Sequence, residues 1–320
     1  MNMRFERIVA KRMEDGLVVR LFPFHVSLEG MEEALLCRDG DDYDVLVKYI
    51  ALAARKADVS VVTYDVVSNH AHMVVLSESE EVCRGFVLDL KRRYSMWLSR
   101  KYGEAKMLHR HVVDVQYLDS DWYLRNAIAY DIRNCLDNGA NNVYEYRWTS
   151  YRCYFCDGGI PEKTIPVSSL SSRQAETILH SGENCSNVAW RLNERYELEP
   201  GSFCNWRYVE AAFGYDQAFF LRILGGVNTA EMTEKLVLAH SSRRTDGELF
   251  KTINEMSQKW YGRNVYDLSS SQKAKLIHYV YRSVRTSVNQ LARCFGLPRD
   301  YVSGILGVKS ASPGAEGGKK

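Results

Sequence analysis

The stretch that decides the fold is Val66-Val67-Ser68-Asn69-His70-Ala71-His72-Met73-Val74-Val75-Leu76. Its apolar and β-branched residues, with those of residues 59–63, predict two strands joined by a turn at Ser68-Asn69. Residues two apart on a strand point to the same face of a sheet, so His70 and His72 project together. Two imidazoles with added oxygen ligands suit Mn²⁺, or Mg²⁺ held with a substrate phosphate. A lone His-x-His pair is most often incidental, so a second element must support it.

That second element is a helix predicted from residue 121, with Asp119 or Ser120 as its cap. Residues four apart on a helix share a face, so Tyr130 and Asn134 lie one above the other. The amide oxygen of Asn134 offers a third metal ligand, and the phenol of Tyr130 offers a nucleophile. A phenol has an ordinary pKa near 10 and needs activation, which a nearby metal ion supplies. The alternative is that both side chains have only a structural role, in capping or packing the helix.

The order of the predicted elements indicates an α+β fold. Strands are expected at residues 18–29, 59–67, 71–77 and 109–117, and helices at 41–57, 80–102 and from 121. This order matches a ferredoxin-like arrangement, an antiparallel sheet backed by helices. The histidine strand would be central, with the Tyr130 helix beside it.

Several segments between Phe24 and Phe155 resemble the single-tyrosine HUH transposases, and within them the REP-associated tyrosine transposases. The segments are Phe24–Ser27, Tyr64–His72, Leu90–Trp97, Val115–Leu124, Tyr130–Asn134 and Arg147–Arg152. The chain departs from the family pattern at Ser68, where proline is usual, at the small Ala71, and at Cys135-Leu136.

The resemblance implies an activity and a set of site residues. His70, His72 and Asn134 would bind Mg²⁺ or Mn²⁺, and Tyr130 would cut single-stranded hairpin DNA through a 5′-phosphotyrosine and rejoin it. The acting unit would be a monomer or a homodimer in the bacterial cytoplasm, associated with the nucleoid. No apolar run in the sequence is long enough to span a membrane, and the eight cysteines are expected to be reduced.

Basic residues are expected to contact the DNA. Helix 80–102 carries Lys91, Arg92 and Arg93 beside Tyr94 and Trp97. Either this helix has an ordinary solvated face with packed aromatics, or its basic groups also meet phosphates, and both together are favoured. The further predicted DNA contacts are Arg110, Arg133, Arg299 and Ser303.

With 320 residues the chain is long enough for two domains. The expected division is a nuclease domain at 1–157, a linker at 158–172, a helical domain at 173–309 and a disordered tail at 310–320. Candidate helices lie at 217–224, 230–240 and 247–261. A helix-turn-helix is expected at 272–307, with helices at 272–285, 288–295 and 299–306, and it would present Arg299 and Ser303 to base edges. The net charge of +2 indicates that any nucleic-acid surface is local.

Three other functions remain open at this point. The chain is a DNA-binding regulator if the fold is retained and the chemistry idle. It is a metal hydrolase if water replaces Tyr130 as the nucleophile. It is a structural protein if the His-x-His pair is incidental.

Overall fold

The computed structural model describes residues 5–13, 15–29, 35–103, 108–109, 111–226, 246–284 and 286–307. Within them the first half of the chain forms a five-stranded antiparallel sheet. Its strands are β1 (Val9–Arg12), β2 (Val18–Glu29), β3 (Ser60–Val66), β4 (His70–Ser77) and β5 (Val112–Tyr117). β4 lies between β2 and β3, and β1 and β5 both pair with β2. The predictions of an α+β fold and of a central histidine strand are therefore confirmed.

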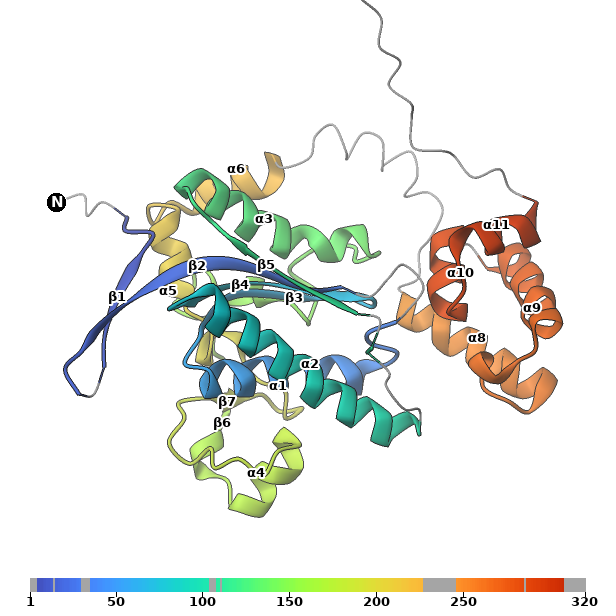
Figure 1. The fold of residues 1–320 in the computed structure, drawn as a ribbon, viewed down its shortest axis with the longest axis horizontal. Coiled ribbons are helices and arrows are strands. Elements are labelled where there is room, and N and C mark those ends of the chain that lie inside the picture. The colour runs from blue at the N-terminus through green and yellow to red at the C-terminus, as the bar shows by residue number, and fades with distance from the viewer. Residues whose placement is uncertain are drawn as a thin grey trace, which may run out of the picture.

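Helices cover both faces of this sheet. α1 (Gly40–Lys56) and α2 (Glu80–Tyr102) lie on one face, and α3 (Asp121–Asp137) lies on the other (Figure 1). Caps set their limits: the Ser120 hydroxyl accepts a hydrogen bond from the amide of Tyr123 at the start of α3. Gly103, with a φ of 70°, ends α2 in the left-handed conformation that glycine adopts without strain.

The two faces of the sheet differ in chemistry. Val26 and Met73 pair across β2 and β4 on the apolar face, which packs against α1 and α2. Ser27 and His72 pair on the other face, which meets α3. Successive side chains along each strand therefore point alternately into the hydrophobic core and into the polar layer.

A β-bulge changes which side chains of β3 belong to the polar layer. Val61 pairs with Val75, but Thr63 pairs with Val74 and Asp65 with His72. The extra residue, Val62, shifts the register by one, and a shift of one residue turns side chains to the opposite face. Without the bulge, Thr63 and Asp65 would point into the apolar core.

The later elements continue the chain. They are β6 (Ile165–Pro166), α4 (Ser172–Leu179), β7 (Arg191–Leu192), α5 (Trp206–Ala212), α6 (Gln217–Gly226), α8 (Asp246–Tyr261), α9 (Ser270–Ser283), α10 (Val288–Phe295) and α11 (Arg299–Leu306). Short 3₁₀ turns lie at Ser150–Cys153, Val167–Ser169, Pro200–Ser202 and Val265–Asp267. The candidate helices at 217–224 and 247–261 are confirmed as α6 and α8. The one at 230–240 and the tail at 310–320 lie outside the described residues.

Part of the predicted linker at 158–172 and part of the predicted helical domain pack onto the core of the sheet. Val167, Leu192 and Phe220 belong to the same hydrophobic cluster as the residues of the sheet. A second hydrophobic cluster joins α8, α9, α10 and α11 with Leu35. These four helices form a group beside the sheet (Figure 1). The division into domains stays a prediction, as does the helix-turn-helix, although α10 and α11 have the predicted bounds. No helix among the described residues is long and apolar enough to cross a membrane.

Candidate metal and tyrosine site

Three histidines lie side by side on the polar face of the sheet. β4 contributes His70 and His72, whose ring centroids are 4.8 Å apart. β2 adds His25, whose ring stacks on that of His72 at 5.2 Å and 20°. His72 is buried, with 4% of its surface exposed. The predicted common facing of His70 and His72 is confirmed, and the sequence analysis missed His25.

α3 brings Tyr130, Asp131 and Asn134 over these histidines. Asp131 and Asn134 are buried, whereas Tyr130 is 46% exposed. The ring centroid of Tyr130 lies 5.4 Å from that of His72 and 6.4 Å from that of His25. The phenol therefore stands at the border between the buried site and solvent.

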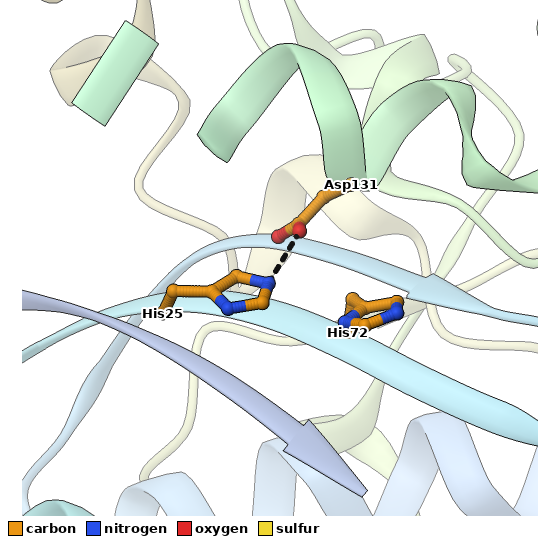
Figure 2. A group of neighbouring side chains, drawn as sticks. All are labelled: His25, His72 and Asp131. Atoms are coloured by element: carbon orange, nitrogen blue, oxygen red, sulfur yellow. Dashed lines mark hydrogen bonds and ion pairs between the residues drawn. The ribbon is translucent and has the colours of Figure 1, made fainter. Parts of the chain in front are cut away.

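One set of contacts joins Thr63, Asp131 and His25, here called the carboxylate triad. Nε2 of His25 lies 3.0 Å from Oδ1 of Asp131 (Figure 2). The Thr63 hydroxyl donates to Oδ2 of the same carboxylate at 2.8 Å and accepts from the amide of Val74 at 3.0 Å. The carboxylate is thus held between a strand hydroxyl and an imidazole.

A second set joins Asp65, Asn134 and His70, here called the amide triad. Nδ2 of Asn134 donates to Oδ2 of Asp65 at 3.2 Å. Both ends of the amide lie close to Nε2 of His70, Oδ1 at 3.1 Å and Nδ2 at 2.8 Å. Which of these two contacts carries the hydrogen depends on the tautomer of His70.

Burial and neighbouring charges shift the pKa values in opposite directions. Burial lowers the pKa of His72 well below its ordinary value, and the nearby His70 and His25 add to the effect. Burial acts most strongly on His25 and lowers its pKa, but the charge and hydrogen bond of Asp131, together with the charges of Asp114 and Glu29, outweigh burial and raise that pKa. Burial raises the pKa of Asp65 well above its ordinary value. Burial therefore favours the neutral form of His72, the form that binds metal ions.

The donor atoms present fit a divalent ion. The ligand atoms of His25, His72 and Asp131 lie within 4.8 Å of one another. Nδ1 of His72 is buried and has no hydrogen-bond partner among the described residues. A buried imidazole nitrogen without a partner is costly unless something binds it. His72 belongs both to this group and to the predicted set of His70, His72 and Asn134, which stays a prediction.

The structure does not bring the predicted basic residues of α2 to the site. Lys91, Arg92 and Arg93 stand on the helix that covers the opposite face of the sheet (Figure 1). Lys91 donates to the carbonyl of His111 at 2.6 Å, and Arg93 pairs with Asp89 and Glu183. Arg92 is exposed and pairs with Asp89 at 2.7 Å.

The other predicted DNA contacts have mixed positions. Arg133 on α3 donates to the carbonyl of Leu224 at 3.0 Å. Ser303 is buried on α11 together with Val302, with 6% of its surface exposed, and its contact with DNA stays a prediction. Arg299 is partly buried at the start of the same helix, and Arg110 lies outside the described residues.

Comparison with known proteins finds little. No protein-family model and no curated protein matches the chain. One solved structure that is similar is of a REP-associated tyrosine transposase bound to a REP hairpin. It has 12% sequence identity and a TM-score of 0.32, and the match covers 44% of this chain and 82% of the other. A likeness of this size carries no inference about activity.

Proposed function

We propose that this chain is a metal-dependent tyrosine nuclease and strand transferase of single-stranded DNA. The observation that carries the proposal is the position of Tyr130, whose half-exposed ring lies 5.4 Å from that of buried His72. A phenol in this position is open to a DNA backbone on one side and borders potential metal ligands on the other. The sequence resemblance supports the same assignment of Tyr130 as the nucleophile.

The reaction is a transfer of one phosphodiester bond. Oη of Tyr130 attacks the phosphorus, the new Oη–P bond forms and the bond from phosphorus to the 3′ oxygen breaks. The phenol gives up its proton, and the departing 3′ oxygen gains one. The products are a 5′-phosphotyrosine and a free 3′-hydroxyl. Because the energy of the bond is retained, the 3′-hydroxyl of another strand reverses the step and joins the strands without ATP.

The proposed metal ligands are His70, His72 and Asn134, with Mg²⁺ or Mn²⁺ as the ion. When bound, such an ion polarises the scissile phosphate and neutralises the charge that develops on it. Burial lowers the pKa of His72 and so favours the neutral imidazole that binds a metal ion. Helix α3 places Asn134 over His70 and Tyr130 over His72. The His25–Asp131 ion pair lies on the other side of His72.

The proposed substrate is hairpin DNA such as a repetitive extragenic palindrome, a choice that rests on the sequence resemblance. The competing function is a regulator that binds DNA with the same fold and cuts nothing.

A denaturing gel tests the proposal. The protein is mixed with single-stranded hairpin oligonucleotides from the DNA flanking its own gene, with Mg²⁺ or Mn²⁺. We expect a slowly migrating covalent adduct that Tyr130→Phe abolishes without weakening hairpin binding. Tyr117→Phe and Tyr123→Phe are the matched controls and should leave the adduct unchanged. Binding without an adduct would favour the regulator, and cleavage without an adduct would favour a hydrolase that uses water.

A further inference from the structure

A buried carboxyl group, that of Asp65, lies beside the proposed metal ligands. Asp65 is fully buried, and it reaches the polar layer only because of the bulge at Val62. Taking a carboxyl group out of water costs free energy that an apolar side chain of similar size would not cost. Its place in the strand therefore points to a role outside packing.

Asp65 has one contact that bears on the site. Its Oδ2 accepts the hydrogen bond from Nδ2 of Asn134 at 3.2 Å, whereas its Oδ1 has no partner among the described residues. A side-chain amide has one donor end and one acceptor end. An acceptor that holds the donor end therefore decides where the acceptor end points. Both ends of the amide face Nε2 of His70, Nδ2 at 2.8 Å and Oδ1 at 3.1 Å, and of the two only Nδ2 also meets Asp65. The contact with Asp65 therefore assigns which of these two atoms is the oxygen.

We propose that Asp65 is a positioning residue that fixes the amide of Asn134 so that its oxygen serves as a metal ligand, an inference that rests on the proposed function. Against ionised Asp65, a flipped amide would set its oxygen against a carboxylate oxygen, and two acceptors in contact repel each other. Groups that orient metal ligands in this way typically change metal affinity by about 10–100-fold when they are removed. The bulge in β3 is then part of the site, since it alone turns Asp65 toward α3.

The test is a double-mutant cycle on Mn²⁺ affinity, measured with the full chain by calorimetry and by electron paramagnetic resonance. We expect Asp65→Leu to weaken Mn²⁺ binding by about 10–100-fold. Asp65→Asn should retain most of the affinity, because its side-chain oxygen still accepts a hydrogen bond. In an Asn134→Ala background, Asp65→Leu should cause no further loss, because nothing remains to be oriented. The matched control is Asp44→Leu, the same change at a partly buried carboxyl group of α1 on the opposite face of the sheet, which should leave the affinity unchanged.

Several results would overturn the proposal. One is an unchanged Mn²⁺ affinity in folded Asp65→Leu. Another is that Asp65→Leu lowers the Mn²⁺ affinity equally in the Asn134 and Asn134→Ala backgrounds. The third is that the unsubstituted protein binds no Mn²⁺. If Asp65→Leu does not fold, the cycle is run with Asp65→Ser, whose side chain is too short to reach the amide. The cycle contains no DNA, so it is separable from the proposed function. A Tyr130 adduct together with an unchanged affinity in Asp65→Leu would reject the positioning role alone.

Discussion

The carboxylate triad and the amide triad have the same arrangement but differ in the charge of their α3 side chain. Each starts at a side chain of β3, passes through a side chain of α3 and ends at a histidine of the sheet. Asp131 carries a charge, so it raises the pKa of His25 and forms an ion pair with it. The amide of Asn134 brings no charge to His70. A metal ion bound by His25 and Asp131 must first displace their ion pair, whereas one bound at the amide triad displaces only neutral contacts.

His72 is shared by the two candidate ligand sets, and removing it should have the largest effect on Mn²⁺ binding. His72 lies between His25 and His70 and belongs to both candidate ligand sets. We expect His72→Ala to abolish measurable Mn²⁺ binding and with it adduct formation. Calorimetry with Mn²⁺ checks the first effect, and the hairpin gel checks the second. Retained affinity in the folded variant would eliminate both ligand sets together.

Removing one α3 side chain at a time decides between the two triads. Removing a residue that hydrogen-bonds to a metal ligand typically weakens metal binding by about 10–100-fold. Because Asn134 is itself a proposed ligand, we expect Asn134→Ala to weaken Mn²⁺ binding by more than this. Asp131→Asn, which keeps the size of the side chain, should change the affinity far less. The opposite order of effects would place the ion at His25, His72 and Asp131, the group whose ligand atoms lie within 4.8 Å of one another.

The titration of His25 without metal measures the difference in charge directly. Its pKa should lie above the ordinary value of about 6.5, because Asp131, with smaller contributions from Asp114 and Glu29, outweighs burial. In Asp131→Asn only the smaller contributions of Asp114 and Glu29 oppose burial, so the pKa should fall. Nuclear magnetic resonance of the imidazole protons gives both values, and equal pKa values in the two proteins would contradict the ion pair.

The same shift has a consequence for stability. A folded pKa above the unfolded one means that the folded state holds the proton more tightly. The stabilisation is therefore complete below about pH 6.5, the unfolded value, and is lost as the pH rises through the raised pKa of His25. Urea denaturation of the metal-free protein across this range should show the loss, and Asp131→Asn should remove it.

The residues of the two triads differ in whether the sequence alone predicts their position. Strand β2, helix α2 and helices α10 and α11 have the predicted limits, because hydrophobic period and capping residues are local signals. The common facing of His70 and His72 follows from the same period. Thr63 and Asp65 were missed because a bulge, which has no local signal here, inverts the alternation of β3.

The remaining misses involve long separations in sequence. The contact of His25 with Asp131 spans 106 residues, so no spacing rule indicates it. Val167, in the predicted linker at 158–172, and Leu192 and Phe220, in the predicted helical domain, join the hydrophobic cluster of the sheet, a packing that no pattern in the sequence indicates. Both features depend on which distant surfaces meet, a property of the folded chain that local patterns do not contain.

The smallest expected effect comes from the strand end of the carboxylate triad. Thr63→Val keeps the shape of the side chain but removes the hydroxyl that donates to Asp131 and accepts from the amide of Val74. Hydrogen bonds to charged groups contribute about 1.5–3 kcal/mol, so we expect a loss of that size in the free energy of unfolding, measured with urea. Mn²⁺ affinity should be unchanged, because Asp131 is not among the proposed ligands. A parallel fall in Mn²⁺ affinity would instead tie Thr63 to the metal through Asp131 and shift the site toward His25.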